Sequence, residues 1–563
     1  MNELMSPALW LICGALLIAV TKGQLRTVVM FAAPMATLWS IWQIPDGVVA
    51  TLTFLEYYQL EPVEGSPLRR LFATIFALMV LVGNLYAFRQ AKWYELASAQ
   101  AYAAGAVGVC FAGDLITLFV FWELMALFST VIVWCGGTPA AKAAGIRYAI
   151  IHLLGGVILK VGIEGVAVQT GSIDVQPMLA TDFNTWMILI GVLINAAAPP
   201  LSSWLSDAYP QSSPTGSVFL SAFTTKTAVL ALILLFPGEH ILIWVGLYMV
   251  MYGIIYALLE NDARRILAYS VVNQVGFMVC GVGIGTETAI NGAAAHAFAH
   301  IIYKALLFMS AGVVIYRTGK TLCTDLGGLF RTMPVTTICC IVGALAISGF
   351  PLTSGFTTKT LISQAAIDAN LAIVYFLLAA ASAGVFLHAG IKFPWFVFFQ
   401  KDSGMRPKDA PWNMGLAMVI FAALCVLIGV FPQAFYQFLP YAVDYEPYAP
   451  GKVLFYLQLL LFSGLAFFIL LPLMRRTLTI SLDTDWFWRV LMWRMGMIVL
   501  RWSRTLVHTT QATAEQFKRQ ALQLNQRGSS RLMRLTQLTS QPIAATSLWI
   551  GVLLIGYVLA YFV

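Results

Sequence analysis

Long hydrophobic runs separated by short polar loops make up most of this chain. A helix needs about 20 apolar residues to cross a bilayer, and runs of that length recur throughout the sequence. The pattern predicts an all-α polytopic membrane protein with about sixteen transmembrane helices. We place these helices at residues 5–22, 25–44, 67–88, 94–113, 115–135, 145–169, 186–204, 216–236, 239–259, 264–284, 287–316, 333–368, 371–396, 411–432, 453–474 and 545–563. The first is expected to be retained, because no basic leader precedes it and no small-residue cleavage site follows it.

Two of the predicted helices are interrupted. The seventh contains Pro199 and Pro200, and the twelfth contains Gly349, Pro351 and Gly355. Proline removes a backbone donor and clashes with the preceding turn. Polar backbone freed in this way is tolerated at membrane depth only against protein or a water-filled cavity. Interrupted helices at matching positions of two halves predict two inverted five-helix repeats with broken helices 7 and 12.

These features divide the chain into six regions. A segment rich in Trp and Arg follows the fifteenth helix, and its alternating apolar and basic runs predict a basic amphipathic arm on the membrane surface. The regions are N-terminal helices 1–3 at 1–93, a first repeat (helices 4–8) at 94–236, a second repeat (helices 9–13) at 237–396, helices 14–15 at 397–476, the amphipathic arm at 477–544 and a terminal transmembrane helix at 545–563.

Composition and charge agree with a membrane location. The chain is 60% hydrophobic and only 10% charged, whereas soluble domains carry about 25% charged residues. The net charge of +8 lies in short alternate loops and in the arm, which favours the positive-inside rule over nucleic-acid binding. We therefore expect a multi-pass protein of the cell (inner) membrane, with both termini outside and the arm on the cytoplasmic side. Arg69 and Arg70, in a predicted outer loop, are the main exception.

Several ionisable residues lie inside the predicted helices, and five of them are the primary candidates for function. A charged side chain at the bilayer centre costs about 2.5–3.5 kcal/mol on insertion scales, so such residues usually face a protein interior or water and move charge. The primary candidates for proton transfer are Glu123, Lys226, His300, Lys304 and Lys359. His296, His300 and Lys304 are spaced by four residues and therefore share one helix face. Because histidine titrates near pH 6.5, this stripe could pass a proton stepwise.

Secondary candidates each have a structural alternative. Lys160 and Glu164 are four residues apart inside the sixth helix, where a local ion pair explains them equally well. Lys392 and His388 lie near the inner end of the thirteenth helix, and the lysine could extend its ammonium to the interface instead. The same alternative exists for Lys359.

No cofactor or metal site is predicted. None of the eight cysteines forms a C-x-x-C pair or a Cys/His cluster with metal-ligand spacing. Nucleotide-binding loops, haem attachment sites and iron–sulfur runs are also missing from the sequence. Any electron transfer would therefore belong to another subunit.

Several motifs together resemble one known family. They are DLITLFVFWELMAL, PPLSSWLSDAYPQSSPTGSVFLSAFTTKTAV, NDARRILAYSVVNQVGFM, HAFAHIIYKALLFMSAG and GFPLTSGFTTK, all within residues 95–400. The chain resembles the antiporter-like subunits of Mrp-type cation/proton antiporters, respiratory complex I and membrane-bound hydrogenases, and most of all the D-type component of the Mrp antiporters. The basic arm is similar to the surface helix that some members lay along neighbouring subunits.

The resemblance implies roles for particular residues. In such proteins a glutamate on helix 5 pairs with a lysine on helix 7, and lysines or histidines on helices 8, 11 and 12 continue the path. Glu123, Lys226, His300, Lys304 and Lys359 match these positions, but Asn195 occupies the position of the helix-7 lysine. An asparagine cannot titrate. Three outcomes follow: Lys160 substitutes for the lysine, the relay is shortened, or the chain is structural without a complete path.

The resemblance implies a membrane subunit of a multisubunit Na⁺(K⁺)/H⁺ antiporter that conducts protons through buried Glu, Lys and His residues. Its implied partners are other hydrophobic antiporter subunits, the lipid bilayer, protons and Na⁺ or K⁺, without nucleic acid. The alternatives are a proton-translocating subunit of a redox complex such as complex I or a hydrogenase, a partner in an inorganic-carbon uptake complex, and a non-conducting scaffold.

Overall fold

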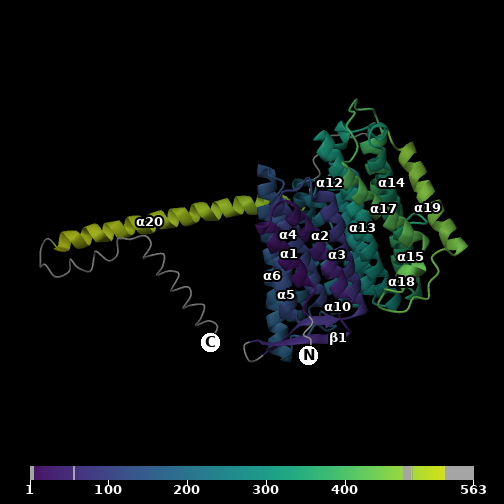
Figure 1. The fold of residues 1–563 in the computed structure, drawn as a ribbon. Helices are drawn as coiled ribbons and strands as arrows, with labels where there is room; N and C mark the ends of the chain where they lie inside the picture. The colour runs from purple at the N-terminus through teal and green to yellow at the C-terminus, as the bar shows by residue number, and fades with distance from the viewer. Residues whose placement is uncertain (1–4, 55–57, 473–482, 485, 526–563) are drawn as a thin grey trace. The chain divides into compact units, whose positions relative to one another are not determined.

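A computed structural model of the chain describes residues 5–54, 58–472, 483–484 and 486–525. Its contacts divide the chain into two units, Met1–Asp485 and Trp486–Val563. In the first unit, helices pack side by side as a bundle (Figure 1). Among the described residues, ten helices are long and apolar enough to cross a membrane. The predicted class, a multi-pass helical membrane protein, is confirmed.

The helices of the first unit follow the predicted runs closely. They are α1 (Ala8–Val20), α2 (Gly23–Ile41), α3 (Pro67–Ala87), α4 (Trp93–Phe111), α5 (Leu115–Trp134), α6 (Pro139–Thr170), α7 (Phe183–Asn195), α8 (Ser203–Ala208), α9 (Gly216–Leu220), α10 (Thr224–Leu235), α11 (Ile241–Leu259), α12 (Ala263–Ile284), α13 (Glu287–Thr318), α14 (Pro334–Ser348), α15 (Ser354–Asp368), α16 (Ala372–Val385), α17 (Trp412–Val430), α18 (Pro432–Tyr436) and α19 (Pro450–Ile469). After α16, wider helical turns continue to Phe399, beyond the predicted end at residue 396.

Helix α13 is the centre of the bundle. It packs against α3, α10, α12, α14, α15 and α17, and its side chains are buried from Ala289 to Val314 except for Phe298. Helix α12 beside it is buried over almost its whole length. A helix that is buried all round presents every face to protein. Ionisable residues on α13 are therefore held away from the lipid.

Both predicted interruptions are confirmed. Helix α7 ends at Asn195 and α8 begins at Ser203, with a cis peptide between Pro199 and Pro200. Helix α14 ends at Ser348, and α15 begins six residues later. Each gap holds one non-glycine residue with positive φ, Ala197 at 61° and Leu352 at 66°. A left-handed backbone is costly for these residues, so the surrounding packing must impose it.

A third interruption was missed. The predicted helix at 216–236 is two helices, α9 and α10, separated at Ser221–Phe223. The separating residues include neither proline nor glycine, so hydrophobicity and punctuation gave no signal. Serine and threonine side chains can bond to nearby backbone and so compete with the helical ladder. The Ser221 hydroxyl donates to the carbonyl of Val218 at 2.8 Å, in agreement with this mechanism.

The loop between α2 and α3 is a β-hairpin, which the sequence interpretation also missed. Strands β1 (Gly47–Phe54) and β2 (Tyr58–Gly65) pair antiparallel. The hairpin accounts for the basic exception in this loop, because Arg69 forms an ion pair with Glu64 and Arg70 forms one with Asp46. The backbone N–H of Glu61 also donates to Asp114, which caps the first turn of α5.

The first unit ends in a polar anchor. The buried carboxylate of Asp483 accepts hydrogen bonds from the hydroxyls of Tyr252 on α11, at 2.5 Å, and Tyr269 on α12, at 2.6 Å. Thr484 hydrogen-bonds to Ser203, the first residue of α8, at 2.9 Å. The segment leading to the arm is therefore fixed to two long helices and to the helix that follows the first interruption.

The second unit contains one long helix, α20 (Trp493–Asn525). Its exposed apolar residues include Trp493 and Trp502, and exposed Arg494 and Arg501 lie among them. A helix within the predicted arm is thus confirmed. The predicted terminal helix at 545–563, and arm residues 477–482, 485 and 526–544, lie outside the described residues.

Replacing Asp483 with alanine should destabilise the first unit. Two buried tyrosine hydroxyls would lose a charged acceptor, and hydrogen bonds to charged groups contribute about 1.5–3 kcal/mol each. We expect a loss of about 3 kcal/mol, seen as a lower thermal unfolding midpoint in detergent. The matched control is Asp444→Ala at an exposed position, where a surface substitution should change stability by less than about 0.5 kcal/mol. Equal midpoints for the two variants would contradict the anchor.

Candidate functional site

Lys226 lies beside the interruption that the sequence did not reveal. Its side chain is fully buried on the first turn of α10. The ammonium donates to the carbonyl of Ser221 at 2.6 Å and to the hydroxyl of Thr225 at 3.1 Å. Ser221 directly follows Leu220, the last residue of α9, so this lysine binds a carbonyl at the point where the helical ladder stops.

Lys359 repeats this arrangement at the second predicted interruption. It lies on α15, is 2% exposed, and donates to the carbonyl of Ile347 at 2.5 Å. Ile347 belongs to the last turn of α14, whose carbonyls lack intrahelical partners. The ammonium also lies 5.0 Å from the ring centroid of Phe277, a distance at which a cation is attracted to an aromatic face. The alternative in which Lys359 reaches an interface is wrong for this buried side chain.

His296 connects the stripe on α13 to the helix that carries Lys359. Its Nδ1 lies 2.9 Å from the hydroxyl of Thr358, and its Nε2 lies 3.2 Å from the hydroxyl of Tyr303. The same tyrosine is 3.1 Å from the amide oxygen of Gln274 on α12. Tyrosine has one hydrogen to donate, so it can serve either the amide or a neutral imidazole. Protonation at Nε2 would shift that hydrogen towards Gln274.

His300 and Lys304 continue the stripe but have unpaired polar atoms. Both are fully buried. Within the described part of the chain, the two ring nitrogens of His300 have no hydrogen-bond partner, and the ammonium of Lys304 has none either. His300 interacts electrostatically with Lys226, Lys304, His296 and Lys359. The predicted residues on α10, α13 and α15 are therefore brought together as one electrostatically coupled group.

Glu123 lies on α5 and is half-buried. Its Oε1 is buried and has no hydrogen-bond partner among the residues that the structure describes. This oxygen packs against Gly156 on α6 so closely that a Cβ at Gly156 would overlap it. Any other residue at position 156 would displace the carboxylate, so the glycine makes room for it.

Asn195, at the position of the helix-7 lysine, has a titratable partner. Its amide oxygen lies 2.7 Å from Nδ1 of His152 on α6. The imidazole is 1% exposed and is held between two rings, with centroids 4.1 Å from Tyr148 and 4.5 Å from Trp204. Its Nε2 is buried without a hydrogen-bond partner among the described residues. The sequence interpretation noted no role for this histidine.

Lys160 and Glu164 are placed differently from the prediction. They form the ion pair that their spacing indicated. However, the side chains are 34% and 55% exposed rather than buried in the bundle. The Lys160 ammonium lies 5.6 Å from the ring centroid of Phe119, which is one turn before Glu123 on α5. Lys160 is therefore engaged at the surface of the bundle.

His388 interacts electrostatically with Lys304 and Lys359 of the coupled group, and also with Lys392. Lys392 is buried and donates to three carbonyls where α11 ends, those of Ala257 at 2.7 Å, Leu258 at 2.5 Å and Glu260 at 2.8 Å. A cation at a helix C-terminus is stabilised by the helix dipole. His388 bonds to the carbonyl of Gly384 in its own helix at 2.9 Å. The contacts of Lys392 are those of a structural cap at the end of α11.

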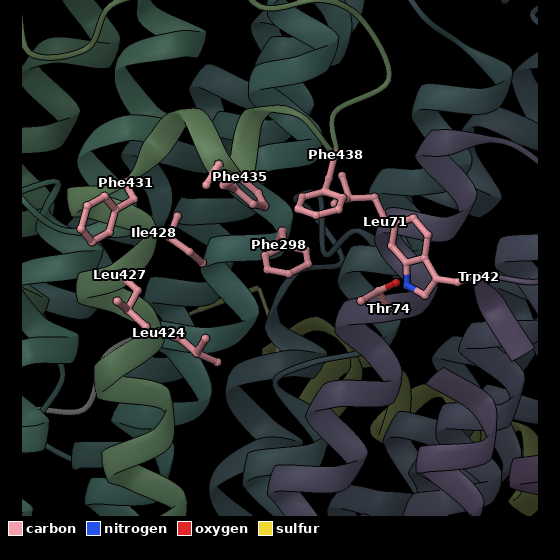
Figure 2. A pocket seen from close by; sticks show the side chains of 11 residues that line it. Trp42, Leu71, Thr74, Phe298, Leu424, Leu427, Ile428, Phe431, Phe435 and Phe438 are labelled. Carbon is pink, nitrogen blue, oxygen red and sulfur yellow. The ribbon is translucent and has the colours of Figure 1, made fainter. Parts of the chain in front are cut away.

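An apolar cavity of about 450 Å³ is lined in part by Phe298 of α13 (Figure 2). Phe298, between His296 and His300 in sequence, lines it together with Trp42 and Phe435, and no charged side chain contributes. Residues two apart on a helix point to different faces. The histidines and the apolar cavity are therefore on different faces of α13.

Tyr303, Gln274 and His152 are the main polar residues that sequence reasoning missed. Each is buried among apolar neighbours, but a neutral polar residue in a membrane helix is far less unusual than a charge. One signal was present, because His152 and His300 both stand thirteen residues after the first residue of a 32-residue helix.

Comparison with known proteins identifies the family. A family described as "NADH:quinone oxidoreductase/Mrp antiporter, TM" matches residues 112–387. The M component of the NADH-quinone oxidoreductase of Pseudomonas aeruginosa is 30% identical, over 58% of this chain and 70% of that protein. The D component of the Na(+)/H(+) antiporter of Alkalihalophilus pseudofirmus is 28% identical, over 76% of this chain and 93% of that protein. The chain belongs to this family of membrane subunits.

A solved structure confirms the fold. A chain in the structure of the Mrp complex from Dietzia sp. DQ12-45-1b superposes with a TM-score of 0.70 over 80% of this chain and 98% of that one. The sequence identity is 22%, so this similarity supports the architecture and not a particular substrate.

Lys392→Met should destabilise the protein more than Lys160→Met. The first change leaves three buried carbonyls without their charged donor, and each unsatisfied group costs about 1–3 kcal/mol. The second removes a partly exposed ion pair, which contributes about 0–1 kcal/mol. Thermal unfolding of both variants in detergent measures the difference. Similar midpoints would show that Lys392 is not a structural cap.

Proposed function

We propose that this chain is a membrane subunit of a multisubunit Na⁺(K⁺)/H⁺ antiporter and conducts protons through buried ionisable residues. Glu123, Lys226, His300, Lys304 and Lys359 would carry the protons. The observation that supports this most directly is the coupled group formed by α10, α13 and α15. Buried charges in membrane helices usually belong to ion or proton pathways.

Electrostatic coupling supplies the driving step. Two like charges repel by about 332/(εr) kcal/mol, so a proton arriving at Lys226 opposes a proton at His300 or Lys304. Each site can then release its proton to the next as the previous one fills. The carbonyls of Ser221 and Ile347 hold the ammonium groups of Lys226 and Lys359, respectively. The unpaired atoms of His300 and Lys304 provide the positions that internal water would occupy.

The finer architecture is part of the proposal. We assign about sixteen transmembrane helices, inverted repeats at 94–236 and 237–396, and both termini outside with the arm cytoplasmic. Two similarities support the repeats. Helices α6 and α13 have the same length, and each is followed by a helix interrupted at a residue with positive φ.

The partners would be other hydrophobic subunits of one membrane complex. Relatives named as components of Na(+)/H(+) antiporters and the similarity to a chain of an Mrp complex support this assembly. The anchor at Asp483 would fix the root of the arm, and the arm would contact neighbouring subunits in the membrane plane.

A redox-driven complex is the second candidate. The similarity to the M component of a NADH-quinone oxidoreductase favours it, and the proton path would be the same. Purification of the native complex distinguishes the two. Flavin and iron–sulfur absorbance in the purified complex would support the redox assignment, whereas small hydrophobic subunits without these chromophores would support the antiporter.

Lys226→Met and Glu123→Gln should each reduce proton flux at least tenfold. Neither replacement side chain can exchange a proton with a relay, and methionine retains most of the lysine's length. Cation-dependent proton movement in inverted membrane vesicles, measured with a pH-sensitive dye, tests this at matched protein levels. The control is Lys408→Met in an exposed loop, which should retain wild-type flux. Unchanged flux in both relay variants would favour the scaffold role.

A further inference from the structure

We propose that His152, positioned by Asn195, is the proton-accepting partner of Glu123 in the first half of this chain. The inference rests on the proposed proton conduction and assigns the role that Asn195 itself cannot perform. The sequence analysis had instead offered Lys160 as one residue that could take the place of the helix-7 lysine.

The contact between Asn195 and His152 fixes the form of the imidazole. An amide oxygen can only accept a hydrogen bond, so Nδ1 carries the hydrogen across the 2.7 Å contact. The neutral ring then has its lone pair on Nε2. This atom is buried and has no partner within the described residues. The ring cannot turn away easily, because Tyr148 and Trp204 pack on it.

Helix α6 brings this imidazole close to the carboxylate. His152 and Gly156 are one turn apart on one face, separated by about 6 Å along the axis. Oε1 of Glu123 lies directly against Gly156. Lys160 lies one further turn along, but it is partly exposed and ion-paired with Glu164. Of His152, Lys160 and Glu164 on this stripe, only His152 is buried and bonded to α7.

The other ionisable groups around His152 are already engaged or neutral. The hydroxyl of Tyr148 donates to Ser129 at 3.0 Å. Arg147, which precedes Tyr148 in the chain, forms a bidentate ion pair with Asp207. Lys226 lies on α10, which packs against α7, and it is bound to Ser221. The ring centroid of Tyr209 lies 5.9 Å from that of Trp204.

The proposed step moves one proton and leaves every other bond unchanged. A protonated Glu123 gives its hydrogen, through intervening water, to Nε2 of His152. The products are a carboxylate and an imidazolium, which attract each other. The Nδ1–H bond to Asn195 persists in both states. Return of the proton, or its transfer onward from Nε2, restores the neutral ring.

The test uses the whole complex in inverted vesicles. His152→Gln, which keeps a donor for Asn195 but cannot carry a proton, should lower cation-dependent proton flux at least tenfold. Lys160→Met should leave flux within about twofold of wild type. Adding Asn195→Lys to His152→Gln should restore flux, with the optimum moved to higher pH, because lysine titrates near 10.4 and histidine near 6.5.

The outcomes separate this inference from the proposed function. Absence of proton flux in the wild-type complex would overturn the proposed function. Wild-type flux that survives His152→Gln, or that is lost in Lys160→Met instead, would overturn the role of His152. If His152→Gln does not accumulate in membranes, the variant Asn195→Ser tests the role of His152 instead. Removing the positioning amide should then shift the pH profile of flux, and an unshifted profile would overturn the proposal.

Discussion

The interior of this protein depends on one type of contact, the hydrogen bond from a buried lysine ammonium to a carbonyl at a helix end. A carbonyl without a partner is costly at membrane depth, and an unpaired ammonium is costlier still. Each of three buried lysines satisfies both groups, because its ammonium donates to a carbonyl at a helix end. These are Lys226 at the end of α9, Lys359 at the end of α14 and Lys392 at the end of α11. The interrupted helices and the buried lysines are therefore one feature, because each makes the other tolerable.

The number of such contacts also distinguishes lysines with a structural role from those that we propose to carry protons. Lys392 uses all three of its N–H donors on three carbonyls, so the loss of one proton would leave at least one of these carbonyls without a donor. Lys359 contacts one carbonyl and an aromatic face, and it interacts electrostatically with His300. Lys304 has no hydrogen-bond partner within the described residues. The fewer fixed contacts a buried amine has, the less its deprotonation disturbs the surrounding backbone.

The sequence was sufficient for the helices because length and hydrophobicity determine them. Proline and glycine likewise located the gaps before Ser203 and Ser354. The gap at Ser221 was not predictable in this way, since it arises from local packing and hydroxyl bonds among ordinary residues. Among the site residues, charge made Glu123 and Lys226 conspicuous. The relation of Asn195 to His152 required the fold, because 43 positions separate them.

The contact between Asn195 and His152 has a counterpart on α13. In the second half, His296 on α13 bonds through Nδ1 to Thr358 on the interrupted partner of its helix. In the first half, His152 on α6 bonds through Nδ1 to Asn195, at the end of interrupted α7. Both halves thus orient an imidazole from the long helix by an uncharged group on the broken one. In the proposed relay, α6 would therefore supply the titratable group that the family resemblance leads one to expect on α7.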